Sequence, residues 1–184
     1  MAESMKGLKR TYRCGELGLN NVGEEVTVMG WVQKQRNKGG IIFVDLRDRA
    51  GILQIIFEES DCGPEHFAKA EKLRSEFVVA VVGRVEKRSG AVNENLPTGE
   101  IEVRAAQVRI LAEAETPPFP IEAESKTKEE LRLKYRYLDL RRPDLQRNLM
   151  LRSKIATTIR AFLSREGFLE IETPILNKST PEGA

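Results

Sequence analysis

Residues in the first half of the chain combine side-chain types that could bind an unpaired nucleic-acid base. A strand predicted over residues 41–49 would place apolar side chains on one face, at Ile42, Val44 and Leu46. Its other face would carry Phe43, Asp45 and Arg47. An aromatic ring on a charged strand face can stack on a base. The pattern alone equally allows Phe43 to cover an apolar patch.

Two further strand residues carry groups that could read the edge of a base. Gln54 lies opposite the apolar face of its predicted strand, and its amide offers a donor and an acceptor together. Glu102 alternates with apolar neighbours, and its carboxylate would repel phosphates while accepting from the N1–H and N2–H₂ groups of guanine. The alternatives are a surface Gln without a role and an exposed Glu paired with Arg104 or Arg84.

A local basic run could contact phosphates. Residues 31–38 contain Lys34, Arg36 and Lys38 and no acidic residue. Basic side chains beside an aromatic are typical of nucleic-acid contact, although three charges also suit a solvated face. We expect Lys34 and Lys38, with Arg47 from the next strand, to contact phosphates.

The bulk composition excludes several other chemistries. A net charge of +2 over 184 residues is small, so any basic footprint must be local. His66 is the only histidine, which excludes Ser-His or Cys-His catalysis built from this chain. The isolated Cys14 and Cys62 predict no metal site and indicate a reducing cytosol. The sequence shows no signal peptide or membrane-spanning run, so we expect a cytoplasmic protein.

The elements that would position these residues form a mainly β domain over residues 1–111. Strands are predicted at residues 25–36, 41–49, 51–57, 77–87 and 100–111. An amphipathic helix at 64–74, with Phe67, Ala70 and Leu73 on its apolar side, falls between the third and fourth strands. Five strands with a helix in this place match the OB-fold, a small barrel that often binds oligonucleotides.

A proline-rich linker at residues 112–127 separates this barrel from a second region. Prolines at 117, 118 and 120 stiffen the linker. We predict a helix at 128–142 and a longer one that begins at Pro143 and is capped by Gly167. A strand pattern follows Gly167 and ends at Pro174.

Three stretches of the sequence carry a family resemblance. They are residues 30–54, residues 131–143, and residues 167–184 with the run Thr180-Pro181-Glu182-Gly183-Ala184. In this order they resemble the N-terminal third of the bacterial aspartyl-tRNA synthetases, which are class II enzymes. The resemblance implies that residues 128–184 are the first helix and strand, with motif 1, of an incomplete α/β catalytic domain.

The resemblance also implies roles in reading the anticodon G-U-C of tRNA(Asp). Phe43 would stack on the central uridine, and Arg36 and Gln54 would read that base. Glu102 would read the first-position guanine, with Asn93 and Asn95 close to it. Lys38 occupies a position that is often apolar in strictly aspartate-specific members. Whether the parent, meaning the full-length synthetase to which this chain would belong, also charges tRNA(Asn) therefore stays open.

Outside the barrel, the resemblance implies that Pro174 lies at a homodimer interface and that Glu182 closes over the ammonium group of aspartate. The parent would use ATP and Mg²⁺ to form aspartyl-adenylate before transfer to tRNA. Motifs 2 and 3 do not appear before residue 184, so we expect no catalytic residue, no cofactor and no adenylate formation in this piece alone.

Two other functions remain open at this point. One is a stand-alone OB-fold binder of single strands, which would leave residues 126–184 unexplained. The other is part of an asparaginyl- or lysyl-tRNA synthetase, which shares the barrel and motif 1. We also expect Ile155, Ile159, Phe162, Ile175 and Leu176 to be exposed or paired with another copy.

Overall fold

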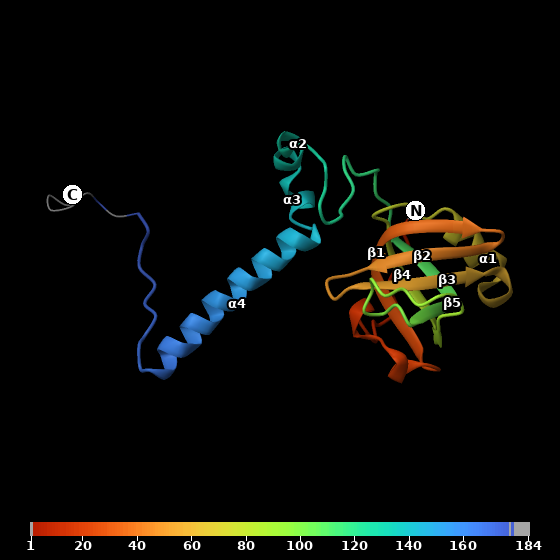
Figure 1. The fold of residues 1–184 in the computed structure, drawn as a ribbon, viewed down its shortest axis with the longest axis horizontal. Helices are drawn as coiled ribbons and strands as arrows, with labels where there is room; N and C mark the ends of the chain where they lie inside the picture. The colour runs from red at the N-terminus through yellow and green to blue at the C-terminus, as the bar shows by residue number, and fades with distance from the viewer. Residues whose placement is uncertain (1, 177, 179–184) are drawn as a thin grey trace. The chain divides into compact units, whose positions relative to one another are not determined.

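The computed structural model describes residues 2–176 and residue 178. The chain divides into two compact units, residues 1–118 and 119–184. The first unit contains five strands, which Figure 1 shows wrapped around one another. They are β1 (Glu25–Lys38), β2 (Ile41–Arg47), β3 (Ile52–Glu58), β4 (Val78–Lys87) and β5 (Ile101–Ala112). Each lies within a few residues of its predicted place.

The five strands close into a barrel in the order β1-β2-β3-β5-β4. Strand β1 pairs antiparallel with both β2 and β4, which closes the ring. Strand β3 pairs antiparallel with β2 and parallel with β5, and β5 returns antiparallel to β4. The predicted OB-fold barrel is confirmed.

The inner face of the barrel holds the apolar residues that the alternation predicted. The side chains of Ile42, Val44 and Leu46 are buried in the core, and Leu53, Ile55 and Phe57 join them from β3. Because side chains alternate along a strand, Phe43, Asp45 and Gln54 project from the other face.

A β-bulge in β1 turns its basic residues outward. Val32 pairs with the buried Leu46, and the register then shifts so that Lys34 pairs with Asp45. Unbroken alternation from Val32 would have pointed Lys34 into the core. The extra residue reverses the faces, so Lys34, Arg36 and Lys38 lie on the outer side with Asp45 and Phe43.

Helix α1 (Glu59–Glu71) starts earlier than the predicted helix at 64–74. Gly63, with φ of 72°, breaks the helical geometry just before Pro64, so the segment is two helical pieces joined at a kink. The helix packs against β5 and β3. Ala70 and Leu73 are buried and Phe67 packs on the core, as predicted.

The second unit differs from the sequence-based prediction in two places. The expected single helix at 128–142 is two short helices, α2 (Glu129–Lys134) and α3 (Arg136–Asp139), separated at Tyr135 by a non-helical backbone. The expected strand after Gly167 is absent from residues 168–176, and the described part of the second unit contains no other strand with which it could pair. A strand needs such a partner to satisfy its backbone groups.

Helix α4 (Pro143–Arg165) agrees with the prediction at both ends. Pro143 occupies the first turn, and Gly167, with φ of 86°, follows the last. The predicted exposure is confirmed for Ile155, Ile159 and Phe162 on the helix, and Ile175 and Leu176 are more than nine-tenths exposed. Within the described residues, no helix has the length and apolarity that a membrane span requires.

Candidate nucleic-acid interface

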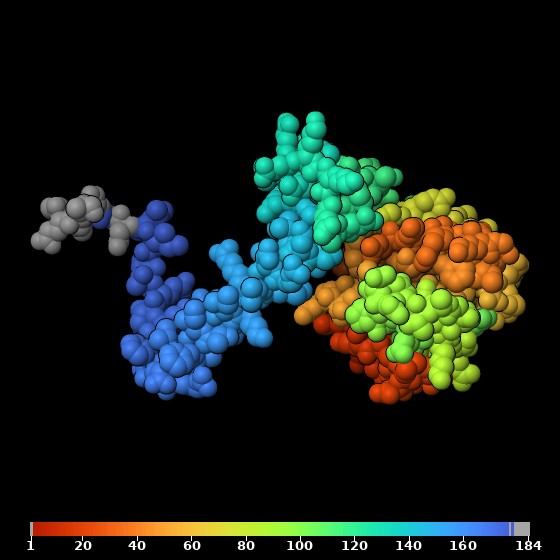
Figure 2. All heavy atoms as spheres, in the orientation of Figure 1, coloured from red at the N-terminus to blue at the C-terminus, as the bar shows by residue number. Residues whose placement is uncertain are grey.

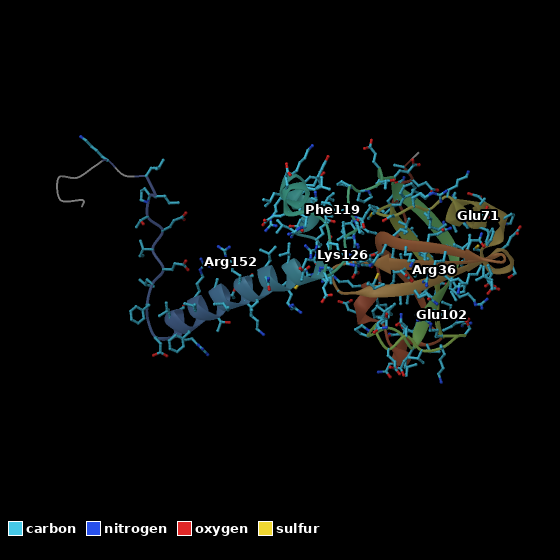
Figure 3. The ribbon with its side chains drawn as sticks, turned by 45° about the horizontal axis from the view of Figure 1, so that its top comes forward. Arg36, Glu71, Glu102, Phe119, Lys126 and Arg152 are labelled. Carbon is cyan, nitrogen blue, oxygen red and sulfur yellow. The ribbon has the colours of Figure 1, made fainter. Side chains whose placement is uncertain are left out.

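A polar pocket of about 220 Å³ lies on the outer face of the barrel. Its lining consists of Arg36, Lys38, Phe43, Gln54, Arg88, Ser89, Gly90, Ala91 and Glu102. Figure 2 shows the yellow-green loop after β4 on the same side of the barrel as the orange strands β1 and β2. Figure 3 labels Arg36 and Glu102 on the barrel. The structure therefore brings together the four residues predicted to read bases.

The strand register explains why residues so distant in sequence meet here. Arg36 pairs with Phe43 across β1 and β2, which places both side chains on the outer face. Ile55 pairs with Val103 between β3 and β5, so the preceding residues Gln54 and Glu102 are neighbours. The pocket is thus built on side chains from β1, β2, β3 and β5.

Arg36 is oriented by an ion pair with Asp45, in which the guanidinium lies 2.6 Å from the carboxylate. Its Nε atom is buried and has no hydrogen-bond partner among the described residues. A donor held in this way can bind an acceptor that enters the pocket.

Gln54 and Glu102 form a hydrogen-bonded network with the loop after β4. The Gln54 amide Nε2 donates to Glu102 at 2.9 Å, and its Oε1 accepts from Arg88 at 2.8 Å. The second oxygen of Glu102 accepts from the backbone N–H of Ser89 at 3.0 Å. Only 5% of Gln54 and 2% of Glu102 is exposed. These two outward-facing side chains are therefore covered by the loop.

The alternative reading of Glu102 as an exposed partner of Arg104 or Arg84 is wrong. The Arg104 guanidinium is held by Asp61 at 2.7 Å, and by Glu58 and Glu86 at 3.2 Å each. The Arg84 Nε donates to the backbone carbonyl of Gly23 at 3.0 Å. Glu102 is instead satisfied by Gln54 and Ser89.

Arg88 and Ser89 are pocket residues that the sequence analysis missed. Both residues lie between the strands predicted at 77–87 and 100–111, and neither was given a role. The alternation held a signal, because Arg84 and Glu86 lie on the outward face of β4 and Arg88, just after its end, continues the same spacing.

The predicted phosphate contacts occupy different surroundings. Lys34 and Lys38 are exposed on the outer side of β1, and Lys38 lines the pocket. Arg47 is bonded to both carboxylate oxygens of Glu76 at 2.8 Å, and only 14% of its side chain is exposed. That ion pair counts against a phosphate contact by Arg47.

The remaining predicted residues are not part of the described lining of this pocket. Asn93 accepts a hydrogen bond from the backbone N–H of Asn95, and neither contributes to the lining. Pro174 is exposed, and Glu182 lies outside the described residues. In the described part of the chain, no three His, Cys, Asp or Glu side chains gather as a metal site would need.

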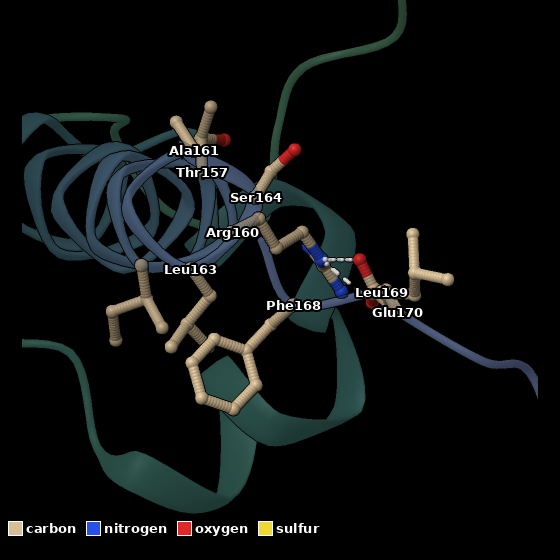
Figure 4. A pocket seen from close by; sticks show the side chains of 9 residues that line it. Thr157, Arg160, Ala161, Leu163, Ser164, Phe168, Leu169 and Glu170 are labelled. Carbon is tan, nitrogen blue, oxygen red and sulfur yellow. Dashed lines mark hydrogen bonds and ion pairs between the residues drawn. The ribbon is translucent and has the colours of Figure 1, made fainter. Parts of the chain in front are cut away.

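Two larger pockets are mainly apolar. One, of about 350 Å³, is lined by residues that include Met5, Leu8, Met29 and Trp31. The other, of about 680 Å³, lies beside the end of α4, where Arg160 bonds both carboxylate oxygens of Glu170 near Phe168 and Leu163 (Figure 4). None of the residues predicted to read bases is among the described residues that line these two pockets. The polar pocket is therefore the candidate interface.

Two family models match the chain. Residues 26–111 match the OB-fold nucleic acid binding domain, and residues 128–184 match the class II tRNA synthetases (D, K and N). The aspartate–tRNA(Asp/Asn) ligase of Lachnoclostridium phytofermentans is 81% identical over the whole chain, and the aspartate–tRNA ligase of Agathobacter rectalis is 67% identical. The chain spans 31% of the length of each of these relatives.

Solved structures share the fold. The asparaginyl-tRNA synthetase of Pyrococcus horikoshii, complexed with asparaginyl-adenylate, superposes with a TM-score of 0.79 at 29% identity, covering 91% of this chain and 37% of that one. The aspartyl-tRNA synthetase of Entamoeba histolytica gives a TM-score of 0.83 at 23% identity, covering 96% and 42%.

Proposed function

We propose that this chain is part of a class II tRNA synthetase of the aspartate–tRNA ligase family, which it matches over its whole length, and that its barrel reads the anticodon of a transfer RNA. The whole protein would activate aspartate with ATP and transfer it to the tRNA in the cytoplasm. The chain of 184 residues would supply recognition without charging.

One observation carries the proposal: four residues with base-reading chemistry, contributed by four different strands, line a single polar pocket. Phe43 offers a ring on which a base can stack, beside the partly unsatisfied guanidinium of Arg36. A pocket that combines an aromatic face with convergent donors and acceptors suits an unstacked base better than a duplex.

The four base-reading residues would contact the first two bases of the anticodon G-U-C. Phe43 would stack on the central uridine, whose carbonyl oxygens and N3–H suit the donors of Arg36 and the mixed amide of Gln54. Glu102 would accept from the donor edge of the first-position guanine. Asn93 and Asn95 would lie near that base from the loop.

Exposed lysines on β1 would contact the phosphates. Lys34 and Lys38 would neutralise backbone charge beside the pocket, and each contact would make binding weaker at higher salt. Arg47 is left out of this surface because Glu76 already holds its guanidinium.

The identity of the tRNA is a finer part of the proposal. The anticodon G-U-C belongs to tRNA(Asp), whereas a tRNA(Asn) would differ in the third base. Relatives named aspartate–tRNA(Asp/Asn) ligase and aspartate–tRNA ligase both match the whole chain. Binding of the chain to stem-loops that differ only in the third anticodon base would separate the two specificities.

The parent protein would work as a homodimer with Pro174 at the interface. The exposed apolar side chains of α4, among them Ile155, Ile159 and Phe162, support an interface in this unit. ATP and Mg²⁺ would serve the parent reaction, but the described residues offer no group of metal-ligating side chains, so no step of that reaction is assigned to them.

Binding of the chain to stem-loops that differ only in the anticodon tests this function. We expect G-U-C to bind more tightly than loops with a changed central or first base, by roughly tenfold or more where the changed base loses a hydrogen bond to Arg36, Gln54 or Glu102. Equal binding to all of them would instead favour a single-strand binder that ignores sequence.

A further inference from the structure

We propose that residues 88–92 form a displaceable cover, whose donors occupy the base-reading acceptors in the free chain. Binding of the RNA would exchange these protein donors for base donors, a guanine-type edge at Glu102 and the N3–H of the central uridine at Gln54. This inference rests on the proposed function, and it identifies how the same pocket opens and which base edge it selects.

The acceptors that would read the first two anticodon bases are already filled. One oxygen of Glu102 accepts from the Ser89 N–H at 3.0 Å, and the other accepts from Gln54 at 2.9 Å. The Gln54 carbonyl accepts from Arg88 at 2.8 Å. With 2% and 5% exposure, neither Glu102 nor Gln54 is open to a base while residues 88 and 89 stay in place.

The cover is attached mainly through the bonds that a base would replace. Gly90, Ala91 and Val92 are exposed, with Val92 at 56%, and no hydrogen bond of theirs is present within the described chain. Besides the contacts of Arg88 and Ser89 to the reading groups, Arg88 has a long bond to the Gly99 carbonyl at 3.4 Å.

Both ends of the cover are fixed. At its first residue, the backbone N–H of Arg88 donates to the Glu100 carbonyl at 2.9 Å. After it, Asn93 donates to Gly99 at 3.2 Å, and Thr98 is bonded to the Ile52 carbonyl of β3. A short exposed segment between fixed ends can move without disturbing the barrel.

The exchange keeps every buried acceptor satisfied. A buried carboxylate without donors is costly, which explains why the free chain supplies its own. Guanine offers N1–H and N2–H₂, which can take the place of the Ser89 N–H on Glu102. The N3–H of the central uridine can take the place of the Arg88 guanidinium on the Gln54 carbonyl. Adenine would present its N1 acceptor to the carboxylate, so it could not replace the cover.

Nuclear magnetic resonance of the whole 184-residue chain tests the exchange directly. In the free chain, the Ser89 amide proton should show a nuclear Overhauser contact with the Glu102 side chain. Addition of a G-U-C stem-loop should abolish this contact, whereas a loop with adenosine in the first position should leave it intact. A loop with inosine, which lacks the 2-amino group, should bind roughly tenfold more weakly than guanosine.

A matched pair of variants tests what holds the cover. Arg88→Ala removes the bond to Gln54 and should raise the hydrogen-exchange rate of the free Ser89 amide by about tenfold. Arg84→Ala removes the same charge from the same face of β4 outside the pocket and should leave that rate unchanged. Equal exchange in both variants would overturn the role of Arg88.

The outcomes separate this inference from the function on which it rests. If the chain selects G-U-C and the contact between Ser89 and Glu102 persists in the complex, the cover does not move and the inference alone fails. If no anticodon is selected, the proposed function fails and the inference fails with it.

Discussion

Gln54 donates a hydrogen bond to Glu102 at 2.9 Å, and this contact joins β3 to β5 on the outer face of the barrel. Both side chains are almost fully covered, although neither belongs to the apolar core. The carboxylate of Glu102 is therefore oriented by the amide that would read the neighbouring base.

This contact predicts that recognition of the first two anticodon bases is coupled. Gln54→Ala should weaken discrimination at the first base as well as at the central one, because Glu102 loses its orienting donor. A double-mutant cycle with Glu102→Gln, measured by stem-loop binding, should give a coupling free energy of about 0.5–3 kcal/mol. Additive effects of the two substitutions would show that the residues act independently.

The ring of Phe43 should contribute through stacking. Phe43→Ala should weaken binding of the G-U-C stem-loop by about 1–3 kcal/mol, the usual scale for one base stack. Phe43→Trp keeps an aromatic face and serves as the control, which should retain most of the affinity. If Phe43→Ala binds the stem-loop as well as the unsubstituted chain does, Phe43 only covers the barrel surface.

The lysines of β1 should determine the salt dependence of binding. Lys38→Ala should reduce the slope of log K against log salt by about 0.7, the value for one single-strand phosphate contact. Lys72→Ala, which removes the same charge just after α1, should leave the slope unchanged. Equal slopes for both variants and the parent chain would remove Lys38 from the phosphate contacts.

The ion pair between Arg47 and Glu76 should be structural. Glu76 is 8% exposed and has a positive φ of 66°, so Arg47→Ala leaves a nearly buried carboxylate in a strained backbone conformation. We expect a loss of about 2–4 kcal/mol in the free energy of unfolding, somewhat below a fully buried pair.

Urea denaturation measures this loss, and a second substitution identifies its cause. Arg47→Ala combined with Glu76→Gly removes both the nearly buried charge and the unfavourable φ, so it should be more stable than Arg47→Ala alone. A double variant that is no more stable than the single one would contradict this account of the pair.

Asp139 should make the second unit sensitive to acid. Burial by itself would raise the pKa of Asp139, but the Arg142 hydrogen bond and the charges of Arg132 and Arg136 hold it below its ordinary value. The ionised carboxylate therefore favours the folded state at pH values above about 3.9, the unfolded pKa. This contribution should be lost as the pH falls through the lower pKa of the folded state.

Amide signals of α2 and α3, followed during acid titration, check this prediction. They should persist down to about pH 4 in the parent chain and be weaker at neutral pH in Asp139→Asn, which removes the charge. Loss of these signals well above pH 4 in the parent chain would mean that another group controls the unit.

Alternation along the strands was enough to predict the barrel and to place Phe43 and Gln54 outside its core. It could not predict that Lys34 faces outward, because a single extra residue in β1 reverses the faces. Alternation also could not predict that Glu102 is buried. In the folded chain Ser89 donates to Glu102, and Arg88 donates to Gln54, which is bonded to Glu102.

The second unit shows the limit of local patterns more clearly. Pro143 and Gly167 mark the ends of α4 because they act through local backbone geometry. The residues after Gly167 have the composition of a strand, yet strand formation depends on a partner that is not among the described residues.

Photo-crosslinking tests most directly whether the polar pocket reads the anticodon. A G-U-C stem-loop with 5-iodouridine at the central position would be bound to the chain, irradiated and mapped by mass spectrometry. We predict a crosslink within β2 at Phe43, which is lost when a G-U-C loop without iodine competes for the chain. A crosslink at Trp31 or in the second unit, with none at Phe43, would contradict the assignment of the pocket.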